Sequence, residues 1–215
     1  MSLVVSKRYK YIFFHLPKNA GVSVSRMLID QEKMLQVRRI SSFFFRKLFK
    51  TKDNFYFSIK RRKFIFFKSH LPCYLFQDII DEEIFSNYLK FAVVRNPWDR
   101  MVSRFFYSKK INIKFKNYDF EEFLKYDLEN NMSVIDQYKY CSDKKNNFCL
   151  DEVIKFENLN NDFNKISSLF FNKKDMLKHL NKSDHKQYRE YYNNYTKDKI
   201  YHYCKKDIEF FEYEF

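Results

Sequence analysis

The stretch YIFFHLPKNAGVSVSRMLI, residues 11–29, decides the fold that we predict for this chain. It opens with YIFFH, a short apolar run that is typical of a strand buried on both faces of a parallel sheet. The next segment, LPKNA, predicts a turn, and VSVSRMLI predicts a helix that begins close to Gly21. Gly21 is the single glycine among 215 residues, so its presence needs a physical reason.

A buried strand that turns sharply into a helix can bind an anion, because free backbone N–H groups and the positive end of the helix dipole meet there. Lys18 adds a mobile cation, and Ser23 and Ser25 add hydroxyl donors. We expect Gly21 to take an unusual φ and to let the backbone approach the ligand, which a Cβ would crowd. The lysine precedes the glycine, so this is no Walker A loop. An ordinary strand-to-helix turn is the alternative.

A second stretch, AVVRNPWDRMVSRF at residues 92–105, places another candidate anion ligand at a strand end. Arg95 ends a predicted strand, and Ser103 lies about two turns into the helix that follows. A guanidinium fork and a hydroxyl in these positions can hold one phosphate together. Arg100 and Arg104 flank Ser103, and either one of them faces the same ligand or both are solvated.

The rest of the chain alternates predicted strands with predicted helices. Strands are expected at 63–70, at 88–95 and within 152–159, where Glu157 lies just past the strand, and helices at 81–89, 96–110, 120–129, 161–171 and 195–211. Pro97 suits the first position of its helix, and Asp119 with Glu122 forms a capping box. This alternation predicts an α/β fold with three layers, a central parallel sheet flanked by helices, organised as one domain over residues 1–215.

The composition is strongly basic, with 41 Lys and Arg against 27 Asp and Glu and a net charge of +14. Such an excess attracts anions, whether nucleic acid, acidic lipid, nucleotide or acidic glycan. A solvated lysine-rich surface, produced by an AT-rich coding bias, explains the charge equally well.

The cysteines and the apolar runs indicate the compartment. Four cysteines show neither a C-x-x-C motif nor metal-ligand spacing, and Cys141 and Cys149 either stay reduced or close a small loop. No run of 18 apolar residues predicts a membrane span, and the apolar part of MSLVVSKRYKY is too short for a signal peptide. We therefore expect a cytoplasmic protein of bacterial or viral origin.

The two stretches together resemble the nucleotide-binding motifs of sulfotransferases. P-K-x-x-G-x-S follows the first strand, and V-R-N-P-x-x-R-x-V-S follows a middle strand. FKSHLP, VIKFENLNNDF, LNKS and the region from YREYY to KKDIEFFEYEF extend the similarity over nearly the whole chain. The chain is most similar to carbohydrate O-sulfotransferases and their bacterial relatives, called sulfotransferase family 2. The resemblance implies a P-loop-like sulfotransferase fold and 3′-phosphoadenosine 5′-phosphosulfate (PAPS) as the sulfuryl donor.

The resemblance also implies which residues bind the donor. The 5′-phosphosulfate would be bound by Pro17, Lys18, Asn19, Ala20, Gly21, Val22 and Ser23. Arg95 and Ser103 would bind the 3′-phosphate, and Ser183, with Asn181 in LNKS, would cover the nucleotide. Val22 stands where the family usually has a hydroxyl residue, so one contact to the phosphosulfate is missing.

Two residues would carry the chemistry. Lys18 would neutralise charge on the leaving phosphate, and His70 matches the place where several such enzymes have a general base. Sulfuryl transfer resembles phosphoryl transfer, for which positioning, charge neutralisation and one base suffice, so no metal is expected. A histidine titrates near the working pH, although a structural histidine at a strand end is the alternative for His70.

Three functions fit these observations. The first is a PAPS-dependent sulfotransferase acting on a carbohydrate, for which the positive charge suits an acidic glycan and no nucleic acid is expected. The second is a P-loop-like nucleotide-dependent kinase, which lacks the Walker lysine arrangement and an obvious Mg²⁺-binding acidic pair. The third is a non-catalytic basic nucleic-acid-binding module, which leaves the paired motifs unexplained.

Overall fold

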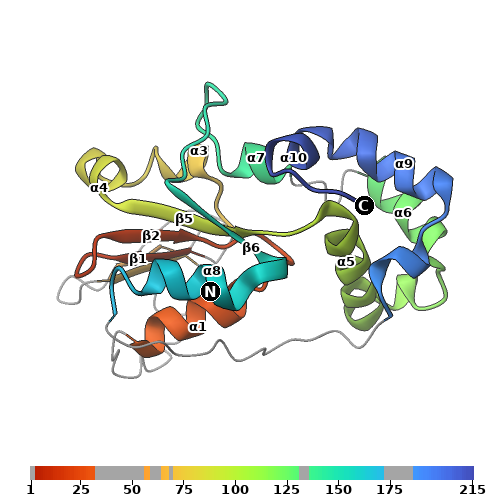
Figure 1. Ribbon diagram of the computed structural model, residues 1–215, viewed down its shortest axis with the longest axis horizontal. Coiled ribbons are helices and arrows are strands. Elements are labelled where there is room, and N and C mark those ends of the chain that lie inside the picture. The colour runs from red at the N-terminus through yellow and green to blue at the C-terminus, as the bar shows by residue number, and fades with distance from the viewer. Residues whose placement is uncertain (1–2, 32–55, 59–63, 68–69, 131–135, 172–185) are drawn as a thin grey trace, which may run out of the picture.

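The computed structural model describes residues 3–31, 56–58, 64–67, 70–130, 136–171 and 186–215 (Figure 1). Within these residues, six strands form one sheet in the order β3-β4-β1-β2-β5-β6. The strands are β1 (Leu3–Ser6), β2 (Tyr11–Phe14), β3 (Tyr56–Ser58), β4 (Phe64–Phe67), β5 (Leu89–Val94) and β6 (Glu152–Lys155).

The sheet is mixed, so the prediction of a parallel sheet is correct for one half and wrong for the other. β5 pairs in parallel with β2 and with β6. β1 pairs antiparallel with β2 and with β4, and β3 pairs antiparallel with β4. The reason is the short link between β1 and β2, which covers only residues 7–10. A parallel pair needs a crossover of about a dozen residues, whereas a short turn produces a hairpin.

Most helices lie at the positions expected from the sequence, with some changes of length. The helices of the described residues are α1 (Gly21–Gln31), α3 (Cys73–Phe76), α4 (Glu82–Asn87), α5 (Pro97–Ile111), α6 (Phe120–Glu129), α7 (Gln137–Tyr140), α8 (Leu159–Ser167), α9 (Asn194–Tyr203) and α10 (Lys205–Phe210). Of these, the short helices α3 and α7 were not predicted. Short 3₁₀ helices are η1 (Ile113–Phe115), η2 (Phe156–Asn158) and η3 (Tyr188–Tyr191).

Alternate residues of the strands enter two separate cores, one on each face of the sheet. On one face, Phe14 and Ala92 pack with Phe76 of α3 and Tyr140 of α7. On the other face, the buried side chains are Val4, Tyr11, Phe13, Phe91, Val93 and Ile154 from the strands and Val24, Leu28, Phe163 and Ile166 from α1 and α8. Figure 1 shows α3, α4 and α7 above the sheet and α1 and α8 below it, which makes the three predicted layers.

A third core holds a helical lobe together. Its members include Trp98 and Phe105 of α5, Phe123 of α6, Ile200 of α9 and Ile208 of α10. The lobe lies beyond the carboxyl end of β5, from which α5 continues directly (Figure 1). The first turn of α5 therefore stands where the sheet and the lobe meet.

Two predicted helix starts are confirmed, and one predicted helix is wrong in extent. Asn96 caps α5 by accepting the N–H of Trp98 at 3.0 Å, and Pro97 is the first helical residue. The capping box of Asp119 and Glu122 opens α6. The strand predicted within 152–159 is β6, which ends at Lys155 before η2 and α8, whereas the predicted tail helix breaks into α9 and α10.

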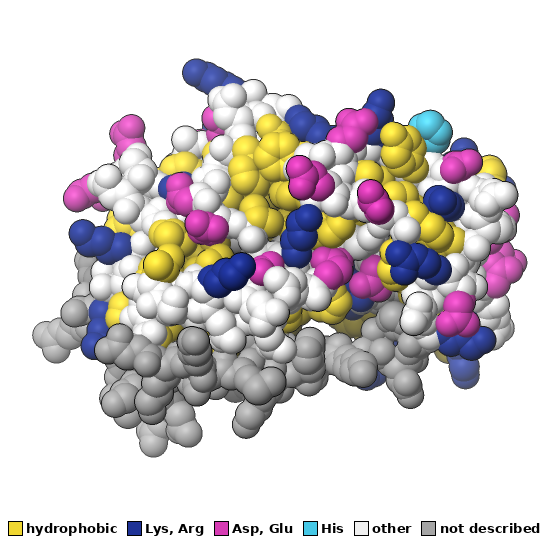
Figure 2. All heavy atoms as spheres, in the orientation of Figure 1, with side chains coloured by type: hydrophobic (Ala, Val, Ile, Leu, Met, Phe, Trp, Pro, Cys, Tyr) yellow, Lys and Arg dark blue, Asp and Glu magenta, His cyan; other side chains and the backbone are white. Residues whose placement is uncertain are grey.

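The thiols and the surface bear on two further expectations. Cys141 and Cys149 are both free, so no disulfide closes the loop between them. None of the helices in the described ranges is long and apolar enough to cross a membrane. On the face seen in Figure 2, Lys and Arg side chains are interspersed with Asp and Glu rather than gathered into one basic patch.

Candidate functional site

The predicted anion loop is a tight turn between β2 and α1. Lys18 and Ala20 both lie in the left-handed region, with φ of 68° and 56°. This conformation is unfavourable for residues with a Cβ and is found where the surrounding structure enforces it, often at functional sites. Ser23 N–H and Val24 N–H donate to the Ala20 carbonyl at 2.9 and 3.3 Å, so the first helical turn closes on Ala20. The amides that precede this closure have no intrahelical partner and can meet an anion.

Gly21 is required for a reason other than the one expected from the sequence. Its φ is not positive, so the prediction of an unusual φ is wrong. A Cβ at Gly21 would instead clash with the imidazole carbons of His15, which is buried at the end of β2. The group that leaves no room for a side chain at Gly21 is therefore the His15 ring and not a ligand. The left-handed backbone conformations of the turn are adopted by Lys18 and Ala20 instead.

The two motifs, 77 positions apart in the sequence, meet in space. Arg95 Nη1 donates to the Lys18 carbonyl at 3.1 Å, and Asn19 Nδ2 donates to the Val93 carbonyl at 2.8 Å. Arg95 is also held by Asp99, whose Oδ2 accepts from Nε at 2.8 Å, and its guanidinium lies 4.0 Å from the centre of the Phe156 ring. Within the described residues, these bonds use two of the five N–H groups of Arg95.

Gln137, at the start of α7, holds both motifs and was not anticipated. Its Oε1 accepts from Asn19 Nδ2 at 2.7 Å and from Arg95 N–H at 3.0 Å, while its Nε2 donates to the Arg95 carbonyl at 2.9 Å. The side chain is fully buried. Gln137 N–H itself donates to Asp207 of α10 at 2.9 Å. No local pattern in the sequence marks this glutamine, because its partners lie far along the chain.

The site gathers positive charge. Burial, followed by the nearby charges of Arg95 and Arg104, lowers the pKa of Lys18 to about 8. Lys18 Nζ lies 4.0 Å from the centre of the Tyr107 ring of α5. A lysine whose charge is disfavoured by other cations is a ready partner for an anion, because a bound negative charge relieves the repulsion.

The two arginines of α5, Arg100 and Arg104, both lie against carboxylates, so the alternative that both are solvated is wrong. Arg104 forms a two-pronged pair with Asp127 of α6, with Nη2 to Oδ1 at 2.9 Å and Nε to Oδ1 at 3.0 Å. Arg100 is buried and lies 4.0 Å from Asp207. Burial raises the pKa of Asp127, and its pairing with Arg104 acts in the opposite direction. These pairs attach α5 to the helices around it.

Ser103 lies on α5 between these arginines and is almost buried, with 6% of its surface exposed. Ser25 Oγ, on α1, is fully buried and has no partner within the described chain. An unused hydroxyl on the helix that follows the first motif suits a polar ligand.

His70 lies beside the start of the loop. Its Nδ1 is 2.8 Å from the His15 carbonyl, and its ring meets the His15 ring edge-on at 4.8 Å. Because a carbonyl only accepts, Nδ1 carries the proton in this contact and the lone pair of the neutral ring is on Nε2. Burial lowers the pKa of His70 below its usual 6.5, against the effect of the bond to His15. Part of the His70 side chain remains exposed, so a substrate can reach Nε2.

The remaining predicted residues divide into those inside and those outside the described structure. Pro17 and Val22 are partly exposed in the turn and the first turn of α1. Ser183 and Asn181 lie outside the described residues. Among the residues that are described, no three His, Cys, Asp or Glu side chains are placed to share a metal ion.

Comparison with known proteins supports the interpretation of the motifs at the level of the family. An uncharacterised protein of Archaeoglobus fulgidus is 31% identical over 98 residues, which cover 45% of this chain and 78% of that protein. No solved structure matches the chain. The model of the sulfotransferase family matches residues 1–214 and includes both motifs. The chain therefore belongs to the sulfotransferase family.

Proposed function

We propose that this protein transfers a sulfuryl group from PAPS to a hydroxyl of a carbohydrate. Membership of the sulfotransferase family supports sulfuryl transfer in general. The observation that carries the specific proposal is the contact of Arg95 with the Lys18 carbonyl at 3.1 Å, which joins the two motifs into one site. A donor with phosphates at both its 5′ and 3′ positions requires two anion sites close together.

The described residues fit such a donor. Burial, followed by the nearby positive charges of Arg95 and Arg104, lowers the pKa of Lys18 to about 8, so three cations lie close together. The buried hydroxyls of Ser25 and Ser103 supply neutral donors beside them. This donor set is cationic and rich in N–H and O–H groups, which is what phosphate oxygens require.

The roles proposed for the first motif follow from charge. PAPS, when bound, supplies the sulfuryl group. Lys18 and the amides that open α1 bind the 5′ end and neutralise the negative charge that the phosphate gains as its bond to sulfur breaks. Ser23 adds a hydroxyl in the same turn, where Val22 has none. Arg95 and Ser103 of the second motif hold the 3′-phosphate.

His70 is the proposed general base. Its Nε2 accepts the proton of the acceptor hydroxyl while that oxygen forms its bond to sulfur. The bond to the His15 carbonyl keeps the ring in the tautomer that this role needs. A carbohydrate is the proposed acceptor because the motifs resemble those of carbohydrate sulfotransferases, and the net charge of +14 suits an acidic glycan.

A ligand comparison tests the proposal. Thermal denaturation is measured with adenosine 3′,5′-bisphosphate, with ATP and Mg²⁺, and with a short oligonucleotide, for the wild type and for Arg95→Ala. We expect the bisphosphate alone to stabilise the wild type, and Arg95→Ala to lose that response. Stabilisation by ATP and Mg²⁺ alone would favour a kinase, and a salt-sensitive response to the oligonucleotide alone would favour a nucleic-acid-binding module.

Transfer itself is then measured with labelled PAPS against a panel of neutral and acidic saccharides. Incorporation of label into a saccharide, lost in His70→Ala, is the expected result. Binding of the bisphosphate together with transfer to a non-carbohydrate hydroxyl would keep the donor and replace the acceptor.

A further inference from the structure

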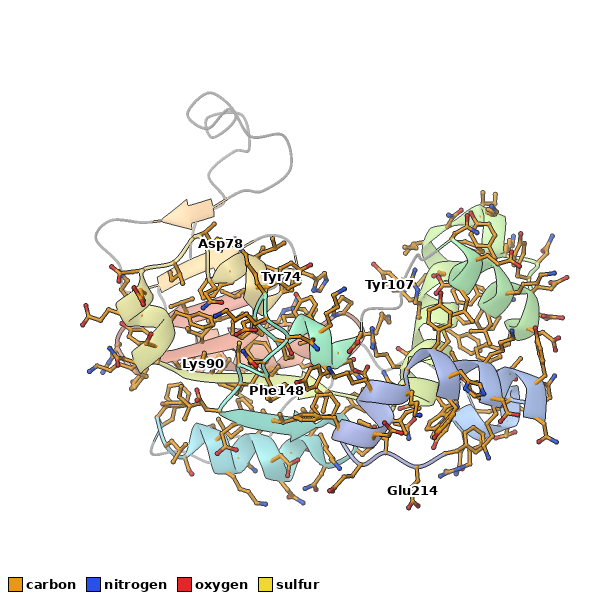
Figure 3. All side chains as sticks on the ribbon, turned by 90° about the horizontal axis from the view of Figure 1, so that it is seen from above. Tyr74, Asp78, Lys90, Tyr107, Phe148 and Glu214 are labelled. Atoms are coloured by element: carbon orange, nitrogen blue, oxygen red, sulfur yellow. The ribbon has the colours of Figure 1, made fainter. Side chains whose placement is uncertain are left out.

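Tyr107 is an exposed aromatic residue that contacts Lys18. It lies on α5, one turn beyond Ser103, and 48% of its surface is exposed. The ammonium of Lys18 lies 4.0 Å from the centre of its ring. Figure 3 shows Tyr107 on the side of the helical lobe that faces the sheet. The contact therefore joins the turn before α1 to the helix that carries the second motif.

The two charged groups that shift the pKa of Lys18 within the described part of the chain are both positive. Arg95 and Arg104 disfavour its ammonium form, and each of these arginines has a carboxylate of its own, Asp99 and Asp127 respectively. An aromatic face attracts an ammonium through its quadrupole but brings no negative charge. A carboxylate in the same place would neutralise Lys18 and compete with an anionic ligand, whereas a ring does neither.

We propose that the face of the Tyr107 ring is a positioning site for Lys18, holding its ammonium charged on one side while the donor's phosphate meets it from the other. This inference rests on the proposed function of Lys18 as a donor ligand. An ammonium carries three N–H groups, so the ring and an anion can be contacted together. Tyr107 is a positioning residue because it acts on the ligand only through Lys18.

The contact has a consequence that depends on pH. The ring attracts only the charged form, so Tyr107→Leu lowers the pKa of Lys18 below about 8. At pH 6.5 Lys18 is charged in both proteins, and their affinities for adenosine 3′,5′-bisphosphate are equal. At pH 9 the variant binds about two- to fivefold more weakly, as an exposed cation–π contact predicts. Tyr107→Phe keeps the ring and behaves as the wild type at both pH values.

The experiment has two readouts. The first is an NMR titration of lysine side chains labelled at Cε in the donor-free protein, in which the low pKa of Lys18 separates its signal and Lys18→Arg confirms the assignment. The second is calorimetric titration with the bisphosphate at pH 6.5 and pH 9. Tyr195→Leu is the matched control, because Tyr195 is also exposed and holds the ammonium of Lys199 at 5.3 Å, on α9.

The outcomes separate this inference from the proposed function. A lower Lys18 pKa in Tyr107→Leu, with weaker binding at pH 9 alone, supports it. An unchanged Lys18 pKa overturns it, and so does tighter binding by the variant at pH 6.5, which would make the ring a competitor of the donor. If the wild type fails to bind the bisphosphate, the proposed function is wrong, and so is the claim that Lys18 meets the donor's phosphate. The NMR titration still decides, in that case, whether the Tyr107 ring holds the ammonium of Lys18.

Discussion

At the scale of single residues, the turn before α1 is shaped by neighbours rather than by glycine's freedom of φ. His15 fills the space beside Gly21, while Lys18 and Ala20 take the left-handed conformations. His15 also accepts, through its carbonyl, the contact of His70 Nδ1 at 2.8 Å. One buried histidine thus links the glycine of the loop to the proposed base.

Gly21→Ala is expected to destabilise the protein by about 1–3 kcal/mol, because the added methyl group must displace the His15 ring. Thermal or urea denaturation measures the effect. His15→Ala in the same chain provides the space for the methyl group, so the double variant should lose less stability than the sum of the two single variants. Strict additivity would show that the ring and the glycine do not constrain each other.

His70→Ala should reduce kcat by about 10²- to 10⁴-fold, which is the usual contribution of a general base. Binding of adenosine 3′,5′-bisphosphate should not change, since the proposed role of His70 is toward the acceptor hydroxyl and not toward the donor. The pKa of His70 is below 6.5, so its neutral form dominates above that pH, and the acidic limb of kcat/KM should have its midpoint below pH 6.5. Near-normal turnover by the variant would remove His70 from the mechanism.

Lys18 should make donor binding sensitive to alkaline pH. Its pKa of about 8 is below the ordinary 10.5, so the ammonium that binds the anion is present below pH 8 and is lost as the pH rises through 8. Affinity for the bisphosphate, measured by calorimetry between pH 7 and pH 9.5, should therefore fall. Lys18→Arg stays charged throughout and should show no such decline. A wild-type affinity that is flat over this range would contradict the assignment of Lys18.

At the scale of elements, α7 is the short helix that fixes the two motifs relative to each other. Gln137 at its first position bonds to Asn19 and to both backbone groups of Arg95. Asp207 of α10 in turn accepts the N–H groups of Gln137 and Tyr138 at 2.9 and 2.8 Å. The proposed anion site is therefore supported from the helical lobe as well as from the sheet.

Gln137→Leu is expected to weaken bisphosphate binding as well as stability, because buried backbone groups of Arg95 lose their partners at a cost of about 1–3 kcal/mol each. Calorimetric affinity and urea denaturation are measured together. Asp119→Ala is the matched control, since it removes the cap of α6 for about 0.5–2 kcal/mol of stability and leaves the motifs intact. If both variants bind the bisphosphate equally well, Gln137 has only a structural role.

At the scale of the whole molecule, a sheet with two covered faces carries a helical lobe beyond the carboxyl end of β5, and the site lies where they meet (Figure 1). The last residues of the chain help to close this junction. The Glu214 carbonyl accepts from Asn96 Nδ2 at 2.7 Å, and the Phe215 ring packs edge-on against Trp98 at 5.4 Å. The cap of α5 and the lobe thus depend on segments far apart in the sequence.

Phe215→Ala should destabilise the helical lobe by about 1–3 kcal/mol, which is less than the about 3–5 kcal/mol of a fully buried ring. Phe215 is partly exposed but contacts Trp98, Tyr188 and Tyr192. The measurement is the midpoint of thermal unfolding, with the half-exposed Phe210 changed to Ala for comparison. An equal effect of the two substitutions would mean that the ring of Phe215 contributes no more than an exposed one.

Local patterns in the sequence were sufficient for the elements that carry the motifs. Each of these patterns lies within one strand–turn–helix segment, where hydrophobic periodicity and helix capping depend on only a few neighbouring residues. They are the apolar runs, Pro97, the Asp119 capping box and the positions of Lys18 and Arg95. The resemblance to the sulfotransferase family rests on the same motifs. The antiparallel half of the sheet, in contrast, was not predicted from the sequence.

The features of the candidate site that were missed arise from side-chain contacts that no sequence pattern records. Gln137 meets partners 42 and 118 residues away, and the His15 ring, not a ligand, is what excludes a Cβ at Gly21. Tertiary structure also decided that Arg100 and Arg104 face buried carboxylates. No periodicity encodes such pairings, because they depend on which side chains the folded chain brings within a few ångströms of one another.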